Sequence, residues 1–513
     1  MKPRIRMKWA VACLAVGWVW TVQAAPYYVN DTYDALSDIY TTAAGNDVNS
    51  GTASNAPKAT LGNLIGTCNL QPGDVVYIDT GTYAPAVISN TVVGVAGTNI
   101  VFQGAPITNW ASGGTVFSGA GYILSIRGQY MLFRDIKTAN GTWGIELGST
   151  ANNTFERVLA NGSQHGVRNS GAAHSNRFSR CVLMSPGASA INIQAPSIDN
   201  SFDNCVFYSS NSAAVIGTAS AVSNIVGSIL IGIEGIQGAT TTPKAGRNNV
   251  FFVGTAHSQY ETLAGLQQAN TNWVWNTCAD PKLLNLAGLD FHLLSAAGYV
   301  SNGVWVTNSA VGYSPAIDFG PRAASVGAEP DPNGGRIDAG IYGGTVEASK
   351  SNTNDWLFAM SFNDGGTLIQ TGRLEWAAST NFGTAGTVDL QYTTNNWATT
   401  NVIATGVAAT NESYYPWVPA FSYPVVRWRV VSSANPAVAS TNARPFSVRQ
   451  TTNTTFNFYV NDGSTANDVY GMGIGNDAND GTTASQPKGT LQAVVTAYQL
   501  RGGDVVYIDT GAY

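Results

Sequence analysis

Charged side chains are scarce in this chain of 513 residues, because Asp, Glu, Lys and Arg together make up 11% of it. Long helices draw on Ala, Leu, Glu and Lys, so this composition argues against them. The 56 glycines, with many Asn, Thr and Ser residues, are typical of turn-rich β structure. A hydrophobic fraction of 44% is enough to bury a core and excludes a disordered chain.

The signatures of several functional classes are missing as well. The formal net charge is −6 and no basic patch stands out, which excludes a nucleic-acid-binding protein. No cluster of Cys and His has the spacing of a zinc site, so we expect no metal site of that kind. The four cysteines beyond Cys13 are too few for a disulfide scaffold in a chain of this length. They are Cys68, Cys181, Cys205 and Cys278.

A long hydrophobic run is also missing. The apolar stretch from Trp9 to Val22 has 14 residues, which is too short for a comfortable membrane span. Four basic residues precede it, and small residues suited to cleavage follow it at Ala24. We therefore predict a signal peptide over residues 1–24 and a secreted or cell-surface protein without a membrane span after cleavage. An uncleaved anchor is the alternative.

The chain contains a long-range repeat. Residues 45–83 match residues 475–513 without gaps, with 21 identities in 39 positions. The nine residues 73–81 return unchanged as 503–511. The second copy stops where the first copy is entering its body, so we expect a sequence that ends inside a domain, as a fragment or an early-terminated member of a longer array.

A shorter period runs through the body of the first copy. Asn recurs every 23 to 25 residues, at Asn153, Asn176, Asn200, Asn224 and Asn249. Two apolar columns follow it, Phe155, Phe178, Phe202 and Val226, then Leu159, Val182, Val206 and Leu230, with Leu132 in the Phe column one repeat earlier. A repeat of this length holds about three short strands, and stacking the repeats about 4.8 Å apart pairs each strand with its next copy. This pattern predicts a parallel β-helix, with a sandwich of chance spacing as the alternative.

The remaining segments differ in pattern. Residues 280–345 are rich in turns and are expected to close the first domain. Residues 355–450 contain strands of alternating polarity, as at 387–392 and 425–431, which is typical of a small β-sandwich. We thus predict an all-β protein. A right-handed parallel β-helix (solenoid) over 25–348 is followed by a β-sandwich over 355–450 and by the start of a second β-helix over 456–513.

These patterns carry a resemblance to a known superfamily. The motifs of the N-terminal segment are Tyr28-Val29, Gly45-Asn46-Asp47, Gly51-Thr52, Pro57-Lys58, Thr60-Leu61 and 73–77, ending in Gly81-Thr82-Tyr83. Together with 290–293, 314–318 and 334–344, they resemble secreted right-handed parallel β-helix proteins of the pectin-lyase-like superfamily with a DUF1565-type N-terminal segment. Residues 355–450 are similar to immunoglobulin-like or fibronectin-type modules. The resemblance implies this fold and a polysaccharide partner, while the superfamily includes both enzymes and non-catalytic surface proteins.

The residue patterns that such enzymes use for catalysis are scarce in this chain. A polysaccharide lyase needs a Lys or Arg base, and calcium or Arg to stabilise charge. The lysines of the β-helix, Lys58, Lys137, Lys244 and Lys282, do not adjoin an acidic cluster in the sequence. The calcium-binding Asp groups of pectate lyases and the paired Asp of polygalacturonases have no counterpart. The sequence leaves enzymatic activity open and favours its absence.

The best local constellation lies on two successive repeats. Glu146 and Arg168 occupy the same column next to the apolar Ile145 and Val167, so both are expected to point outward as stacked neighbours. With His165, which precedes the second of these strands, they are the catalytic candidates.

Three further residues are candidates for ligand binding. They are Trp143 one repeat below His165, Asn192 in the Glu146 column, and His174 after the second strand. The alternative for the whole constellation is a surface ion pair with two turn histidines.

Three other patterns have a functional and a structural interpretation. Arg134, Arg157 and Arg180 form a predicted column that could grip an acidic polymer, or else consist of solvated turn residues. Asp47-x-Asn49-x-Gly51 resembles the start of a calcium loop but lacks the remaining ligands of such a loop, so a turn is the favoured interpretation. We therefore expect no cofactor, and a structural or catalytic calcium ion is the alternative. Cys181 and Cys205 share a column, which leaves a bridge and unpaired thiols equally open.

The sequence leaves two functions open. The first is a secreted or surface protein that binds carbohydrate, adheres, or acts as a spacer built from repeated modules. The second is a polysaccharide lyase or glycoside hydrolase acting on an acidic glycan. The repetition of whole modules favours the first, because a spacer gains from repetition while an active site need not.

Overall fold

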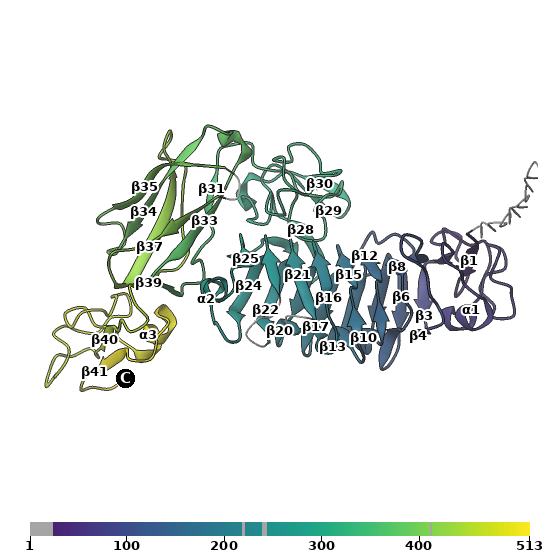
Figure 1. Cartoon of the computed structure of the whole chain (residues 1–513), viewed down its shortest axis with the longest axis horizontal. Helices are drawn as coiled ribbons and strands as arrows, with labels where there is room; N and C mark the ends of the chain where they lie inside the picture. The colour runs from purple at the N-terminus through teal and green to yellow at the C-terminus, as the bar shows by residue number, and fades with distance from the viewer. Residues whose placement is uncertain (1–23, 218–220, 239–243, 411–412) are drawn as a thin grey trace, which may run out of the picture.

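The computed structural model describes residues 24–217, 221–238, 244–410 and 413–513, so the predicted signal peptide lies almost wholly outside the described residues. Figure 1 shows a solenoid of short strands, a second β domain and a small C-terminal unit. Helices are few and short: α1 (Leu61–Thr67), α2 (Leu263–Ala269), α3 (Leu491–Ala497) and the 3-10 turns η1 (Ser309–Val311) and η2 (Thr380–Phe382). In the part of the chain described, none is long and apolar enough to cross a membrane.

The first domain is a parallel β-helix, as the short period predicts. Its strands pair in parallel with their copies on neighbouring turns, which form three faces. Face A is the sheet of β1 (Pro26–Val29), β2 (Val75–Ile78), β5 (Ile100–Gly104), β8 (Met131–Arg134), β12 (Thr154–Glu156), β15 (Arg177–Ser179), β18 (Asn200–Asp203), β21 (Val222–Val226), β23 (Ala245–Arg247) and β25 (Trp273–Val274).

The other two faces belong to one continuous sheet. Face B contains β3 (Gly81–Tyr83), β6 (Thr115–Ser118), β9 (Ile136–Ala139), β16 (Val182–Ser185), β19 (Val206–Ser209) and β26 (Thr277–Cys278). Face C contains β4 (Ala86–Ile88), β7 (Tyr122–Ile126), β10 (Gly141–Leu147), β17 (Ser189–Ile193) and β20 (Ala213–Gly217). Three long strands run through both faces, β13 (Leu159–Asn169), β22 (Ile229–Gln237) and β24 (Val250–His257). The pair β11 (Thr150–Ala151) and β14 (Ala173–His174) lies at the corner between faces C and A.

A column of phenylalanine rings fills the inside of face A. Successive centroids lie 5.0, 5.0, 4.4 and 4.9 Å apart, along Phe102, Phe133, Phe155, Phe178 and Phe202. These distances match the spacing of paired strands, so each ring packs on its copy in the next turn. The column confirms the predicted Phe positions on three turns, but Phe133, not Leu132, is the partner of Phe155.

The asparagines form two ladders rather than one. At the corner between faces C and A, Nδ2 of Asn153 donates to Oδ1 of Asn176 over 3.1 Å, and Nδ2 of Asn176 donates to Oδ1 of Asn200 over 3.0 Å. Asn249 stands at the other end of face A, where its Nδ2 donates to Oδ1 of Asn276 over 2.9 Å. Asn224 lies within β21 and is exposed. The prediction of a single five-membered column is therefore wrong.

A change of register explains that error. The pairing of β18 with β21 shifts by one residue after Asn200, because Asn200 pairs with Val222 while Ser201 pairs with Asn224. The structure places Ile225 and Ile229 in the two apolar columns to which the sequence assigns Val226 and Leu230. A one-residue slip moves a side chain to the opposite face, which is why a fixed repeat length fails here.

The corner between faces A and B turns through one left-handed residue on each repeat. Positive φ values between 51° and 59° occur at Asp135, Arg157, Arg180, Asn204, Gly227 and Asn248. Arg134 does not belong to this column, because it lies in β8 and pairs with Glu156. The predicted column of three arginines is thus wrong for Arg134 and correct in stacking Arg157 with Arg180.

The turn-rich segment 280–345 covers the outside of face B. It contains β27 (Leu283–Asn285), β28 (Asp290–Leu293), β29 (Tyr299–Ser301) and β30 (Val304–Val306). Figure 1 shows β28, β29 and β30 above the solenoid. Apolar side chains on the outside of face B and from this segment share one buried cluster, including Val182, Val206, Ile229, Val250, Phe291, Leu293, Ile317, Phe319 and Ile341. The segment therefore covers the part of face B that carries these apolar residues, whereas the cluster leaves out the outward residues of face C.

Three buried carboxylates organise the end of this covering segment. Asp338 accepts the backbone N–H groups of Asp318 and Ser349 at 2.9 and 3.1 Å, and Glu329 accepts those of Asp338 and Gly344 at 2.9 and 2.7 Å. Burial raises the pKa of Asp318 to about 6 and the pKa of Glu329 to about 7. It also raises the pKa of Asp338.

The second domain consists of two sheets around a common core. One sheet has β31 (Leu357–Ala359), β33 (Gly372–Ala378) and β36 (Ser413–Trp417). The other has β32 (Thr367–Ile369), β34 (Thr387–Thr393), β35 (Asn401–Ala408), β37 (Tyr423–Ser432), β38 (Ala439–Thr441) and β39 (Phe446–Arg449). Trp376 and Trp428, one from each sheet, are fully buried between them. This arrangement is sandwich-like, and its relation to immunoglobulin or fibronectin modules stays a prediction.

The sandwich caps the last turn of the solenoid. Thr277 in β26 accepts a hydrogen bond from Nδ2 of Asn363 at 2.9 Å, and its hydroxyl donates to the carbonyl of Met360 at 3.3 Å. The N–H of Leu263, at the start of α2, donates to Asp364 over 2.6 Å. Polar groups of the last turn thus bond to the second domain.

The C-terminal unit repeats the start of the solenoid. β40 (Asn457–Val460) pairs in parallel with β41 (Val505–Ile508), as β1 pairs with β2, and α3 takes the place of α1. A bidentate ion pair joins this unit to the sandwich, with Arg449 Nη1 and Nη2 at 2.9 and 2.7 Å from the carboxylate oxygens of Asp504. Both side chains are 1% exposed.

Candidate functional site

The predicted site residues lie on the outside of face C. Strand alternation turns Ile145, Val167 and Ile191 into the solenoid core, so the residues beside them point outward. Trp143 pairs with His165, while Glu146 pairs with Arg168 and Arg168 with Asn192. The structure therefore brings five of the six candidates together in the predicted columns.

His174 is the exception. It lies on β14, in the corner sheet between faces C and A, and its nearest strand partner is Ala151. Its Nδ1 atom is buried without a hydrogen-bond partner among the described residues. We therefore place His174 outside the face C cluster.

Trp143 is the centre of an alternating stack. On one side its indole stacks on Tyr122 of the preceding turn, with ring centroids 4.4 Å apart and ring planes at 23°. The guanidinium of Arg168 lies 4.9 Å from the indole centroid. A cation at this distance from a ring is attracted by the negative face of the π system. The stack holds Arg168 in place, and a ligand would meet ring edges and polar groups rather than an open indole face.

Glu146 is bound tightly to the protein and is only 2% exposed. Its carboxylate accepts hydrogen bonds from the hydroxyls of Ser125 and Ser170. Arg127 forms its ion pair at 3.6 Å. The partner of Glu146 is thus Arg127, not the predicted Arg168, because Arg168 turns toward Trp143. A carboxylate held in this way is poorly placed to exchange protons with a substrate.

His165 belongs to a directed chain of hydrogen bonds. Gln194 donates to Oδ1 of Asn192 over 2.9 Å, and the amide of Asn192 donates to Nε2 of His165 over 3.3 Å. Because Nε2 is an acceptor, the proton of the neutral ring sits on Nδ1 and is donated to Ser189 over 2.8 Å. Burial, and then the charge of Arg168, lowers the pKa of His165.

Several members of this site were not among the sequence-based candidates. Tyr122 could have been found by extending the Trp143 column one turn back, since the two residues pair directly. Ser125, Ser170 and Arg127 gave no sequence signal, because serines and isolated arginines are common on solenoid turns. Their role depends on the carboxylate of Glu146 being close.

The arginines at the corner of faces A and B are neutralised locally. Arg134 and Arg180 bond the two oxygens of Glu156 at 2.9 and 2.8 Å, and Arg157 bonds Asp135 at 2.8 Å. Burial raises the pKa of Glu156, but the two arginines outweigh it and lower the pKa overall. This geometry favours the structural interpretation of these arginines over a grip on an acidic polymer.

The calcium-like turn is occupied by hydrogen-bond donors. Asp47 accepts from the N–H groups of Ala59 and Thr60 and from the hydroxyl of Thr60, at 3.0, 2.9 and 3.0 Å. The residues described include no group of three or more His, Cys, Asp or Glu side chains that could hold a metal ion. Cys181 and Cys205 are buried as free thiols.

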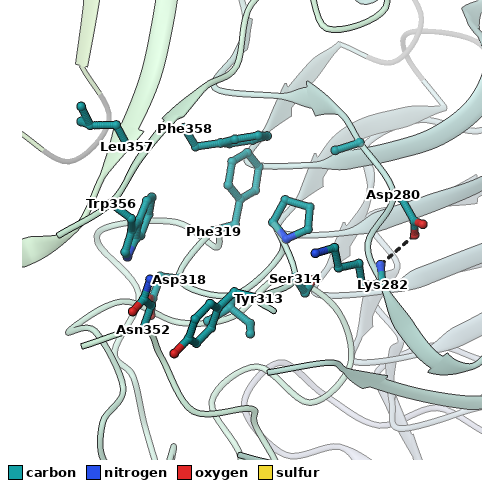
Figure 2. Close-up of a pocket in the computed structure, with 13 residues that line it drawn as sticks. Asp280, Lys282, Tyr313, Ser314, Asp318, Phe319, Asn352, Trp356, Leu357 and Phe358 are labelled. Atoms are coloured by element: carbon teal, nitrogen blue, oxygen red, sulfur yellow. Dashed lines mark hydrogen bonds between the residues drawn. The ribbon is translucent and has the colours of Figure 1, made fainter. Parts of the chain in front are cut away.

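A separate cavity of about 400 Å³ lies between the face B covering segment and the sandwich. Figure 2 shows Trp356, Phe319 and Phe358 around it, with Asp318 and Asn352 at one side. Its lining is mainly apolar, and Asp318 is already bonded to the hydroxyl of Ser351 at 2.7 Å. The cavity suits an apolar group better than charged reactants.

Comparisons with known proteins find only distant structural likenesses. No protein-family model and no curated protein sequence matches the chain. Among solved structures, pectate lyase Pel9A matches with a TM-score of 0.36 and 14% identity, over 62% of this chain and 96% of that one. An alginate lyase from Paenibacillus sp. str. FPU-7 matches with a TM-score of 0.30 and 12% identity, over 38% of this chain and 85% of that one. Neither likeness assigns an activity or a residue role to this chain.

Proposed function

We propose that the chain is an extracellular carbohydrate-binding protein that lays an extended polysaccharide along face C. The observation that carries this proposal is the register of Tyr122, Trp143 and His165, which repeat outward on successive turns. Turns spaced about 4.8 Å apart offer a regular row of contacts to a regular polymer. Arg168, Asn192 and Gln194 add hydrogen-bonding groups to the same face.

The hydrogen bonds inside the site favour binding over catalysis. Glu146 is saturated by two hydroxyls and an arginine, and both ring nitrogens of His165 have partners. A catalytic acid or base needs a free position within reach of the substrate. An adhesive or spacer role is compatible with the same surface, because the C-terminal unit repeats the start of the solenoid.

The experiment is a retention assay on acidic glycans such as pectin, alginate and chondroitin. We expect the protein to be retained, and Trp143→Ala to lose most of this retention while its circular dichroism is unchanged. The matched control is Trp305→Ala, because Trp305 is 43% exposed on β30, away from face C. Equal loss of retention in both variants contradicts the proposal. So does a parent protein that no glycan retains, and that result would favour a role as a structural spacer.

A lyase is the second candidate, on one specific observation. A histidine with a lowered pKa stands beside the fixed positive charge of Arg168. A neutral base next to a cation is the pair that proton abstraction beside a carboxylate requires. Unsaturated product that absorbs in the ultraviolet, lost in His165→Ala, would establish this activity. New reducing ends without that absorbance would indicate a hydrolase.

A further inference from the structure

A polar groove lies where face A meets the sandwich. Its volume is about 390 Å³, and its lining comes from face A, the segment after α2 and the sandwich. Figure 1 shows β25 at the end of the solenoid, on the side of the sandwich. Arg247, Trp275, Arg373 and Tyr414 line it together with Asn224 and Asn272.

Cations and rings alternate through this groove. The guanidinium of Arg247 lies 4.8 Å from the Trp275 ring centroid, and that of Arg373 lies 5.9 Å from it. Arg373 also lies 3.7 Å from the ring of Tyr414. Rings that hold guanidinium groups by their faces leave the N–H edges free to bond a planar anion.

The two arginines differ in how they are neutralised. Nε of Arg373 bonds Glu375 at 3.1 Å, and that carboxylate is 1% exposed and also accepts the N–H of Trp275 at 3.0 Å. Arg247 is exposed, and no carboxylate of the described residues forms an ion pair with it. The groove therefore carries a positive charge that no acidic side chain in its lining offsets.

One donor in the lining also lacks an acceptor. Nε1 of Trp275 is buried, and no hydrogen-bond partner exists for it among the described residues. Tyr414 is 47% exposed and offers a ring edge and face beside the two arginines.

We propose that this junction groove binds a sugar that bears a carboxylate. The carboxylate is bonded by Arg247 with help from Arg373, and the sugar ring packs on Tyr414. Face A and the sandwich form this site, so it is distinct from the face C surface and does not depend on it.

The test uses the full chain and calorimetric titration with three uronate trimers, from galacturonate, mannuronate and guluronate. We expect at least one to bind, its fully methyl-esterified form not to bind, and Arg247→Gln to weaken binding by about tenfold or more. The control is Arg177→Gln, on the same face, whose ion pair with Asp203 at 2.8 Å leaves its side chain 60% exposed. It should change affinity less than about twofold.

Two further variants separate this site from face C. Tyr414→Ala should weaken the trimer, and Trp143→Ala should leave its affinity unchanged even where retention on the polymer is lost. Binding of the ester as tightly as the acid overturns the proposal. So does Arg247→Gln with the parent affinity, or a failure of all three trimers to bind.

Discussion

The Nδ2 atom of Asn153 donates to Oδ1 of Asn176, and Nδ2 of Asn176 donates to Oδ1 of Asn200, so Asn176 is both acceptor and donor in the corner ladder. It also accepts the backbone N–H of Asn153 at 3.1 Å and is fully buried. Removing this side chain leaves buried donors without an acceptor, at about 1–3 kcal/mol for each such group.

We therefore expect Asn176→Ala to lower the free energy of unfolding by about 2–4 kcal/mol, measured by urea titration. Asn224→Ala is the matched control, because Asn224 is exposed on a face and lies outside both ladders. Its effect should stay within about 0.5 kcal/mol. Equal effects of the two substitutions would show that the ladder does not stabilise the solenoid.

The Phe column predicts a graded response at its centre. Phe178 stacks on Phe155 and Phe202 at 4.4 and 4.9 Å, with no exposed surface. Phe178→Ala leaves a cavity that neighbouring turns cannot fill and should cost about 3–5 kcal/mol, whereas Phe178→Leu should cost markedly less. The midpoint of chemical unfolding measures both variants, and a similar loss in each would count against ring stacking as the source of stability.

The buried carboxylates of the covering segment predict a pH dependence. The folded pKa values of Asp318 and Glu329 lie above their unfolded values, so folding favours their protonated forms. Stability is then largest below the unfolded pKa, near 4.5 for Glu329, and falls as pH rises toward about 7. Hydrogen exchange of the segment's amides should accordingly show less protection at pH 8 than at pH 5, after correction for intrinsic rates.

Glu329→Gln should flatten this dependence, because the amide oxygen still accepts the two N–H bonds while no charge forms. Glu347→Gln, two residues beyond the segment, is the control and should keep the slope of the parent protein. Below about pH 4.5 an opposite trend is expected from Glu156, whose pKa is lowered by Arg134 and Arg180. A Glu329→Gln protein with the parent's slope would refute the assignment.

The ion pair between Arg449 and Asp504 should matter far more than its surface counterparts. Breaking a buried pair from one side leaves an unpaired buried charge and costs about 3–5 kcal/mol. Arg449→Met should therefore release the C-terminal unit from the sandwich, which limited proteolysis near residues 451–455 would detect. Arg177→Met, at an exposed pair with Asp203, should leave the digestion pattern unchanged and cost less than about 1 kcal/mol.

The β-helix could be predicted from sequence because side chains of the same type recur at the positions that stack on one another in successive turns. Phe155, Phe178 and Phe202 fall into register as expected, and so do Glu146, Arg168 and Asn192. The prediction fails where the backbone changes register without a sequence mark, after Asn200. The spacing of the asparagines cannot reveal the extra residue that β21 contains at this point.

The sequence predicted which residues of the face C site stack on one another, but it did not predict their hydrogen bonds and ion pairs. The sequence placed Glu146 beside Arg168. In the structure Arg168 packs against the ring of Trp143 instead, and Arg127 forms the ion pair with Glu146. The junction groove gave no signal at all. Arg247 comes from the solenoid and Arg373 from the sandwich, and both lie against the ring of Trp275. No local sequence pattern indicates that these two domains bring them together.

The cap on the last turn has a consequence for self-association. A bare terminal strand of a solenoid is a template on which the first turn of another copy could add, because its backbone groups and apolar core are open. Here Asn363 and Met360 bond to Thr277, and the sandwich occupies the end of the stack. The second domain thus covers the end of the solenoid on which another copy would stack, and this disfavours end-to-end polymerisation independently of any ligand on faces A or C.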